Sequence, residues 1–286
     1  MERRTFIKKT IQVALASNLL FSSKLFAGFS GNPDLVIANG KQPADLLKLS
    51  LNAIGGLEQF DIKGKRVIIK PTIQWDSAPE ESRNTNPELI YSIIRQCYDA
   101  KAWEVYVFDH TTDDWRLSYQ TSGIEKATKL AFGKIIPAND YRYYEKHNDT
   151  QDLFCFHQLV HKCDLIINVP KLRIETPNML WGAVQNLQGL TWENGHFSPV
   201  TRDCDMLSIL NYIQPVLNVA EVSIVNAGEK QQEVALLTGK NSITIDAFAC
   251  QLAGIDPYSI GYLKCAAEMG IGSLKTDHLT IQKIFT

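Results

Sequence analysis

Three motifs that often mark an enzyme or a nucleotide-binding protein are missing from this sequence. It contains no G-x-G-x-x-G of dinucleotide-binding folds, no G-x-x-x-x-G-K-[ST] of P-loop proteins and no G-x-S-x-G nucleophile elbow. The usual signatures of those three chemistries are therefore absent. The sequence also lacks internal repeats, low-complexity segments and Pro- or Ser-rich linkers, which favours a single domain.

Cysteine occurs six times, but no two cysteines form the C-x-x-C pair of many redox and zinc sites. A chain of this size does not need disulfides, although an oxidising compartment would permit them. Three cysteines fall in apolar stretches with helical spacing, where cysteine usually serves as a small buried hydrophobic residue. These are Cys97, Cys250 and Cys265.

A weaker constellation surrounds the segment that begins at Cys155. His157 and His161 are four residues apart, and with Cys155 and Cys163 they could supply the four ligands of a zinc site. The two cysteines are eight residues apart, however, so no regular element brings all four side chains to one point. We therefore interpret the segment as surface chain that leads into the next strand.

A membrane-spanning apolar run is also missing. The opening residues MERRTFIKKT place Arg3 beside Arg4 before the run IQVALASNLLF, which is typical of a twin-arginine export signal. The run is about half of the roughly 20 residues that a spanning helix needs, so we predict a removable signal and no stable membrane anchor. We expect cleavage after Ala27, the Tat export machinery as a partner, and a periplasmic location. The alternative is a basic amphipathic helix that begins a cytoplasmic protein.

An excess of positive charge is missing as well. The net charge is −2, and residues 1–27 carry five basic residues and one acidic residue, so removal of the signal takes it to −6. Lys and Arg contacts to phosphate supply most non-specific affinity for nucleic acids. We therefore expect no nucleic-acid partner.

Short runs rich in Val and Ile alternate with longer segments of helical period, which predicts repeated β-α units. We predict an α/β fold with a mixed, mostly parallel sheet flanked by helices, in a single domain over residues 28–286. The predicted strands are 34–38, 66–69, 104–108, 165–169, 221–225 and 234–237. The predicted helices are 43–55, 87–100, 123–132, 206–219, 243–253 and 259–269.

Ligands of open α/β sheets bind beyond the carboxyl ends of the parallel strands. In this sequence, the residues that end or follow the predicted strands include Lys70, the pair Asp109 and His110, the segment Pro170–Arg173, and Asn226. If these strands are neighbours, their ends bring several cationic side chains together with Asp109 and His110. The sequence therefore predicts a crevice at this edge of the sheet.

Such a mixture suits a small anionic ligand, a carboxylate or a phosphate. We predict that Lys70, Lys171 and Arg173 hold the anion and that Asp109 or His110 handles protons. The alternative is that strand ends are polar simply because they reach water. The long segment 191–205 could be a lid or a packed surface loop, and its residues do not distinguish the two.

The order of several motifs resembles the prokaryotic family called domain of unknown function 362, over residues 34–272. The motifs are VIIKPT, TNPELIYSIIRQCYDAKAWEVYVFDH, SGIEKA, CDLIINVPKLR, WGAVQNLQG, SITIDAFACQLAGIDP and AAEMGIG. Members of that family often carry twin-arginine signals, and some add ferredoxin-type cysteine clusters, which this chain does not have. No general activity is established for the family.

The resemblance implies site residues that match the family's motifs one by one. They are the strand-end Lys70, the acidic Asp109, the pair Pro170 and Lys171, the Asn-x-x-Gly of Asn186 and Gly189, and Asp246.

Three positions depart from the family's pattern. Glu175 stands where histidine is common, Gln185 where lysine is common, and Asn226 where aspartate is common. Histidine has a pKa near 6.5 and glutamate one near 4.3, so this change replaces a neutral ligand or base by a carboxylate. The chain is then either a member with altered substrate or metal preference, or one that binds without catalysing.

Two hypotheses follow from the sequence. The first is an exported protein with an anion or metal-ligand site at the strand ends, in which Lys70, Lys171, Arg173, Asn186 and Asn226 bind and Asp109, His110 or Glu175 handles protons or a metal. The second is a non-catalytic accessory or partner protein of a periplasmic redox or cofactor-loading system. The sequence names neither a cofactor nor a metal.

Overall fold

The protein is seen in a computed structural model that describes residues 32–146, 155–176, 178–192, 203–224 and 233–286. The predicted export signal and the predicted binding residue Asn226 lie outside these described residues. In the described part of the chain, no helix combines the length and the apolar character needed to span a bilayer.

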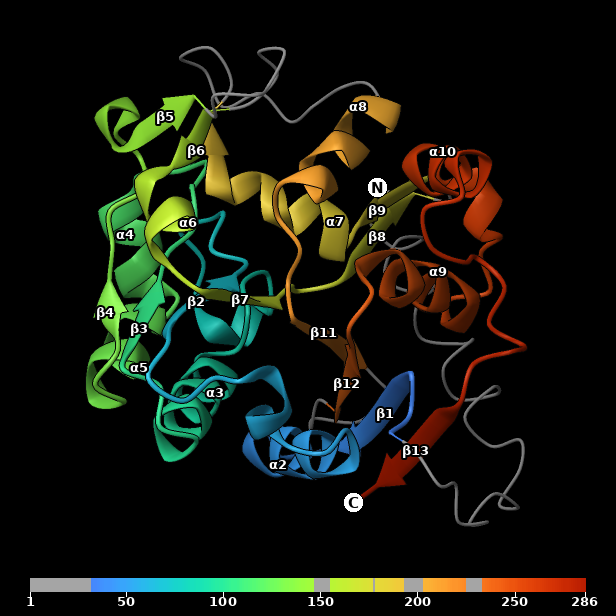
Figure 1. The fold of residues 1–286 in the computed structure, drawn as a ribbon, viewed down its shortest axis with the longest axis horizontal. Helices are drawn as coiled ribbons and strands as arrows, with labels where there is room; N and C mark the ends of the chain where they lie inside the picture. The colour runs from blue at the N-terminus through green and yellow to red at the C-terminus, as the bar shows by residue number, and fades with distance from the viewer. Residues whose placement is uncertain (1–31, 147–154, 177, 193–202, 225–232) are drawn as a thin grey trace, which may run out of the picture.

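A central sheet of eight strands organises the molecule (Figure 1). All its strands run parallel except β12, which pairs antiparallel with both of its neighbours. The predicted mixed, mostly parallel α/β sheet is therefore confirmed. In spatial order the strands are β13 (Ile281–Phe285), β1 (Leu35–Gly40), β12 (Glu233–Gly239), β11 (Leu217–Ile224), β7 (Leu165–Val169), β2 (Arg66–Pro71), β3 (Glu104–Val107) and β4 (Lys134–Ile135).

Helices cover both faces of this sheet in two layers, which we name lower and upper after their members at the bottom and at the top of Figure 1; helices at the left of the view stand at the height of the sheet. Successive strand residues point to opposite faces, so Val36 packs with the lower helices and Leu35 and Ile37 pack with the upper ones. The lower layer is α2 (Pro43–Ala53), α3 (Pro87–Asp99), α4 (Trp115–Thr121) and α5 (Ile124–Leu130). The upper layer is α6 (Gln158–Lys162), α7 (Ala183–Asn186), α8 (Asp203–Leu207), α9 (Ser242–Leu252) and α10 (Gly261–Met269).

Two small sheets lie outside the central one. One has the order β10 (Thr191–Trp192), β6 (Cys155–His157) and β5 (Tyr144–Lys146). The other is the hairpin of β8 (Arg173–Thr176) and β9 (Met179–Trp181). Because β8 follows β7 after only three residues, this hairpin stands at the carboxyl edge of the central sheet.

Local sequence signals explain most of the element boundaries. The Asn86 side chain accepts a hydrogen bond from the Glu88 amide at 2.8 Å and Pro87 fills the first turn, so α3 begins there. The predicted helix over 206–219 is wrong. After α8 the chain forms a short 3₁₀ turn and then enters β11 at Leu217, since Pro215 cannot continue a helix.

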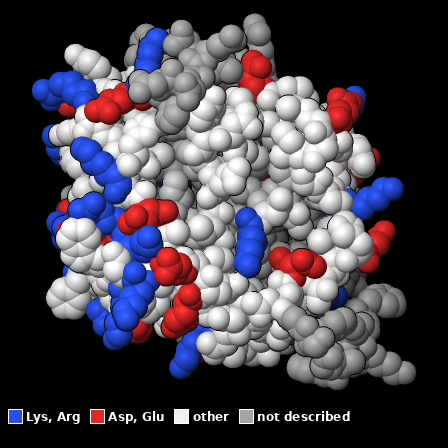
Figure 2. Space-filling view, viewed as in Figure 1, with Lys and Arg blue, Asp and Glu red and all other residues white. Residues whose placement is uncertain are grey.

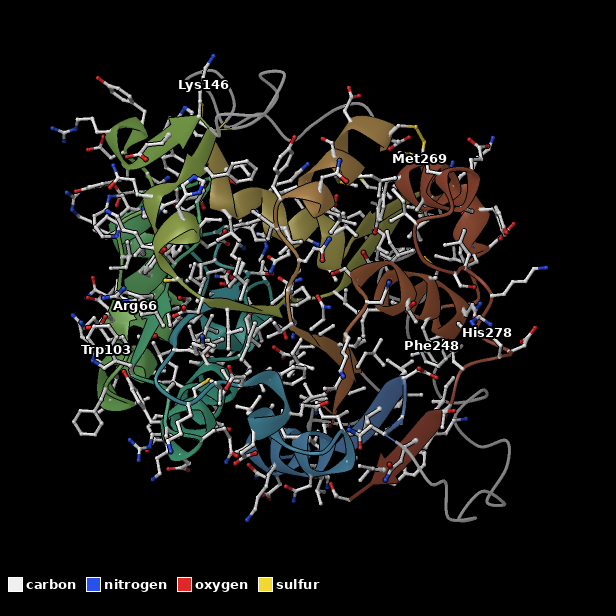
Figure 3. The ribbon with its side chains drawn as sticks, in the orientation of Figure 1. Arg66, Trp103, Lys146, Phe248, Met269 and His278 are labelled. Atoms are coloured by element: carbon white, nitrogen blue, oxygen red, sulfur yellow. A yellow bond between two sulfur atoms is a disulfide. The ribbon has the colours of Figure 1, made fainter. Side chains whose placement is uncertain are left out.

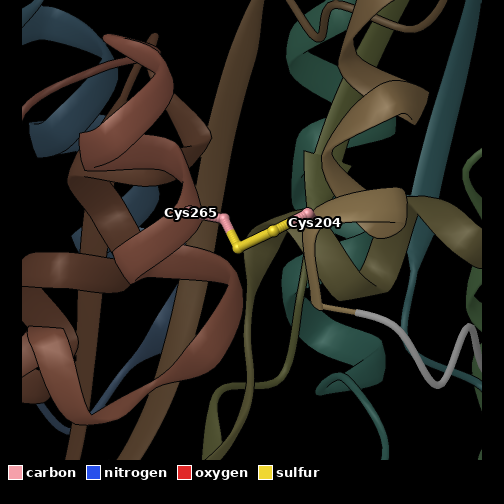
Figure 4. The surroundings of a disulfide bond; sticks show 2 residues. All are labelled: Cys204 and Cys265. Atoms are coloured by element: carbon pink, nitrogen blue, oxygen red, sulfur yellow. A yellow bond between two sulfur atoms is a disulfide. The ribbon is translucent and has the colours of Figure 1, made fainter.

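A disulfide joins Cys204 in α8 to Cys265 in α10 (Figure 4). The expectation that Cys265 is a simple buried hydrophobic residue is therefore wrong, because the packing of the two helices brings it opposite Cys204. Cys97 and Cys250 are buried and unpaired, as predicted. The surface in view in Figure 2 mixes basic and acidic side chains, in keeping with a net charge near zero.

Candidate functional site

A buried ion pair stands where β2 and β3 end. The Lys70 ammonium lies 2.8 Å from the Asp109 carboxylate, and both side chains have almost no exposed surface. Lys70 also donates to the Pro71 carbonyl at 2.7 Å and to Asn186 Oδ1 at 3.0 Å. The second Asp109 oxygen accepts from the Ile73 amide at 2.7 Å. All three ammonium protons and both carboxylate oxygens therefore have partners within the chain.

The protonation of this pair is set by two opposing effects. Burial raises the pKa of Asp109 and lowers the pKa of Lys70, because a charged group loses solvation in the interior. The attraction between the two groups opposes both shifts. The pair is therefore sensitive to any change that admits water or removes one partner.

A row of buried amides continues from Lys70 across the sheet. Asn186 Nδ2 donates to Asn168 Oδ1 at 2.8 Å, and Asn168 Nδ2 donates to Asn218 Oδ1 at 2.9 Å. Lys70, Asn168 and Asn218 occupy paired positions on β2, β7 and β11. Asn218 Oδ1 also accepts from the Ser242 hydroxyl at 3.0 Å, at the start of α9. One hydrogen-bonded chain thus runs beneath the upper helices.

A second buried ion pair lies one strand further along. Lys171 Nζ donates to Glu221 Oε1 at 2.6 Å, and the other Glu221 oxygen accepts from the Asn86 amide at 2.8 Å. The Lys171 amide donates to the Thr72 hydroxyl, which in turn donates to Asn186 Oδ1. The loops after β2 and β7 and the start of α3 are therefore tied together at one edge.

Gly189 explains why the Asn-x-x-Gly segment passes so close to the first pair. A Cβ atom at this position would lie 1.8 Å from Asp109 Oδ1 and 2.7 Å from Lys70 Cε. Only glycine permits this approach. The Gly189 carbonyl also accepts from the His110 amide at 3.2 Å, which fixes the loop after β3.

His110 is buried beside this pair, with its ring edge-on to Trp192 at 4.7 Å between centroids. Burial, aided by the positive charge of Lys70, lowers the pKa of His110 to about 4. The imidazole is therefore neutral near pH 7. A neutral imidazole can accept a proton, but with a pKa of about 4 it is a weak base near pH 7, because general-base catalysis works best when the pKa is close to the working pH.

The remaining predicted residues form a separate group on the β8–β9 hairpin. Arg173 Nη2 lies 2.5 Å from Glu175 Oε1, and both side chains keep some exposure. The Arg173 guanidinium stands over the rings of Trp75 and Trp181, at 4.4 Å and 5.6 Å from their centroids. Within the described residues, Glu175 pairs with Arg173 rather than with the Lys70 and Asp109 pair.

Asp246 holds the helix that carries Asn186. Its carboxylate accepts from the amides of Ala183 and Val184, at 2.5 Å and 3.0 Å, and from the Tyr262 hydroxyl at 2.8 Å. Burial raises the pKa of Asp246 to about 6 against the effect of these three donors. The family's late aspartate therefore acts on the site through α7 and does not contact the first ion pair.

The residues considered for a zinc site, Cys155, His157, His161 and Cys163, do not form a metal-binding cluster. His157 Nδ1 accepts from the Leu159 amide at 3.2 Å and its ring packs against Phe108 at 4.5 Å. Across the described ranges, no three histidine, cysteine, aspartate or glutamate side chains gather closely enough to hold a metal ion.

Sequence reasoning missed Glu221, Asn168 and Asn218, which are all buried in strands. Glu221 begins the predicted strand 221–225, and nothing in that run marks it as the partner of Lys171. The signal that could have found them is a polar residue in an otherwise apolar strand, such as Asn168 in the run LIINV.

Comparisons with known proteins add the following. A family model described as "Domain of unknown function (DUF362)" matches residues 67–251. No curated protein matches the sequence. Among solved structures, the lactate racemase apoprotein from Thermoanaerobacterium thermosaccharolyticum is similar, with a TM-score of 0.47 and 14% sequence identity. The match covers 79% of this chain and 58% of that protein, so this chain spans less than two thirds of its length.

Proposed function

The chain belongs to the domain of unknown function 362 family, whose description names no activity, and we propose its function from the site itself. The protein is exported to the periplasm and binds a small anionic molecule, a carboxylate or a phosphate, at the carboxyl edge of β2, β3 and β7. The observation that carries this proposal is the partly exposed Arg173 guanidinium on the strand that follows β7, at the edge where the buried pair of Lys70 and Asp109 joins the ends of β2 and β3.

The energetics of buried charge support a functional role for this edge. A buried ion pair often stabilises a fold less than well-packed hydrophobic residues of similar volume. Two such pairs, Lys70 with Asp109 and Lys171 with Glu221, stand at the edge where open α/β sheets bind ligands. Strongly perturbed ionisable groups also concentrate at functional sites.

The contacts suggest a division of roles among the predicted residues. All three Lys70 protons and both Asp109 oxygens have partners within the chain, so this pair positions the loops. Arg173 is partly exposed and is the cation that would contact the anion. His110 is the candidate that would take up a proton, and it would do so as a weak base because its pKa is lowered to about 4.

The competing function is a non-catalytic accessory protein of a periplasmic redox or cofactor-loading system. One observation favours it: Lys70, Lys171 and Arg173 each have a carboxylate partner within the chain. A network that is already neutralised holds loops in place without needing a ligand. Glu175 and Gln185, where the chain departs from its family's pattern, are consistent with lost chemistry.

A thermal-unfolding panel separates the two functions. Purified protein is heated with acetate, benzoate, succinate or phosphate, with sodium chloride at equal ionic strength as the control, and its metal content is measured by mass spectrometry. A ligand at one hundred times its Kd adds about 2.7 kcal/mol to stability, which raises the Tm by roughly 5 °C or more. If every anion gives the chloride result and metal is substoichiometric, the ligand-binding proposal fails.

Export is tested separately. The Cys204–Cys265 disulfide supports it, because disulfides persist mainly in oxidising compartments. Replacing both Arg3 and Arg4 by lysine should keep the protein in the cytoplasm, since the paired arginines are the recognised feature of the signal. An unchanged periplasmic yield would rule out the twin-arginine route.

A further inference from the structure

Two tryptophans and two arginines meet at the β8–β9 hairpin, and we call Trp75, Arg83, Arg173 and Trp181 the tryptophan–arginine cluster. They come from the loop after β2, the segment before α3, and strands β8 and β9. Arg83 and Arg173 both stand over the Trp75 ring, at 4.9 Å and 4.4 Å, and the rings of Trp75 and Trp181 meet edge-on at 6.0 Å. Two distant segments, residues 75–83 and the β8–β9 hairpin, thus converge at the carboxyl edge.

Two hydrogen-bond donors of this cluster have no acceptor in the described part of the chain. Arg173 Nε and Trp181 Nε1 are shielded from solvent and find no hydrogen-bond partner among the described residues. A buried donor without an acceptor costs free energy and is uncommon in folded proteins. Such a donor therefore indicates a place where an acceptor from outside the chain can bind. Arg173 keeps about a quarter of its side chain exposed (24%), but not at Nε, so an acceptor reaches Nε only when neighbouring side chains move aside.

The charges of the cluster are also unbalanced. Glu175 bonds to Nη2 of Arg173 and offers one negative charge against the two guanidinium groups. Burial lowers the pKa of Arg173, the attraction of Glu175 opposes this shift, and the repulsion from Arg83 adds to it. One further negative charge would neutralise the cluster.

We propose that the tryptophan–arginine cluster binds the carboxylate of a small organic acid, with Arg173 Nε and Trp181 Nε1 donating to its oxygens and Arg83 supplying the second positive charge. A carboxylate carries the single charge that the cluster lacks, whereas a phosphate monoester carries up to two. Guanidinium and carboxylate are matched in geometry for paired hydrogen bonds. The inference deepens the proposed function and rests on it for the class of ligand.

The two unpartnered donors can be observed directly. Protein labelled with ¹⁵N is titrated with sodium benzoate, and the Trp181 indole Nε1–H and the Arg173 Nε–H signals are followed by ¹H–¹⁵N NMR, with Trp181→Phe to assign the indole signal. Both signals should move and saturate together. Arg173→Gln should abolish the response, and Arg83→Gln, at an exposed position, should raise the Kd at least tenfold.

Arg66 and Trp103 provide the matched control (Figure 3). Arg66 stands over the Trp103 ring at 4.3 Å, but its Nε already donates to Glu104 at 3.4 Å. The Trp103 signal should therefore stay still, and Arg66→Gln should leave the benzoate titration unchanged. Equal movement of the Trp103 and Trp181 signals, or an unchanged titration in Arg173→Gln, would overturn the proposal. A stronger response to phosphate than to benzoate at equal ionic strength would overturn its choice of carboxylate.

The His110 ring signals separate this inference from the proposed function. If benzoate raises the Tm and moves the His110 signals but leaves the Trp181 signal unchanged, the cluster proposal fails and the proposed function stands. Movement at Trp181 without any change at His110 would instead remove the proton-transfer role and keep the subsite. If neither signal moves, both proposals fail.

Discussion

The Lys70 ammonium and the Asp109 carboxylate lie 2.8 Å apart between the ends of β2 and β3, with almost no exposed surface on either side chain. Each charge is compensated mainly by the other, because the surrounding groups are neutral amides and carbonyls. This relationship determines how the site responds to substitution, to pH and to a ligand.

Removing one partner of this pair should be far more costly than removing both. Lys70→Met leaves the Asp109 carboxylate buried without its cation, and we expect the free energy of unfolding to fall by about 3–5 kcal/mol. Asp109→Leu should cost a similar amount, and the double variant Lys70→Met/Asp109→Leu should cost less than the sum. Urea denaturation of the four proteins measures this coupling. Additive losses would show that the two charges do not depend on each other.

Gly189→Ala should destabilise the protein because the added methyl group meets the ion pair. With Asp109 Oδ1 1.8 Å from the new Cβ, the loop must shift, at a cost of about 1–3 kcal/mol or more. Gly64→Ala is the control: its φ of 73° strains a side chain, but no atom lies within 4 Å. That variant should lose only about 1 kcal/mol. Equal losses in the two variants would contradict the close approach at Gly189.

The stability of the protein should fall as the pH drops from about 6.5 to 4, in part through His110. Its pKa is about 4 when folded against 6.5 ordinarily, so in this window the unfolded chain binds a proton that the folded chain does not. His110→Gln should therefore flatten the pH dependence, by up to roughly 3 kcal/mol at pH 4. His157, whose pKa burial also lowers to about 4, remains as an internal comparison. Identical pH slopes for wild type and His110→Gln would exclude this role.

Loss of the disulfide should lower stability substantially. Cys204 and Cys265 are 61 residues apart, and closing a loop of that length stabilises a fold by about 4 kcal/mol in the chain-entropy view. Cys204→Ser should approach this loss, while Cys163→Ser, at a half-buried free cysteine, should change little. A thiol assay of the denatured, unreduced protein should count four free thiols, and a count of six would show that the disulfide does not form.

Much of the sheet could be predicted because its strands are short apolar runs between helical segments. The order of the strands could not, since pairing depends on contacts between distant segments. The predicted helix over 206–219 is wrong because Pro215 disfavours a helix in the chain before it, and this effect outweighs the helical spacing of the apolar residues.

The site was predictable where its residues lie at the end of a strand, as Lys70 does, or follow one within two residues, as Asp109 and Lys171 do. Their partners were not. Glu221 lies inside β11, and only the pairing of β11 with β7 brings it to Lys171. The sequence pattern therefore indicated which charges meet at the edge of the sheet, and the fold determined how they are paired.

The most direct test of a ligand site at this edge is a crystal structure with 4-bromobenzoate, whose bromine is located by anomalous scattering. Our account predicts one strong bromine peak at the carboxyl edge of β2, β3 and β7, with the carboxylate against Arg173 and Trp181, and its loss in Arg173→Gln crystals. A peak found only elsewhere on the surface, or none at a saturating concentration, would contradict the account.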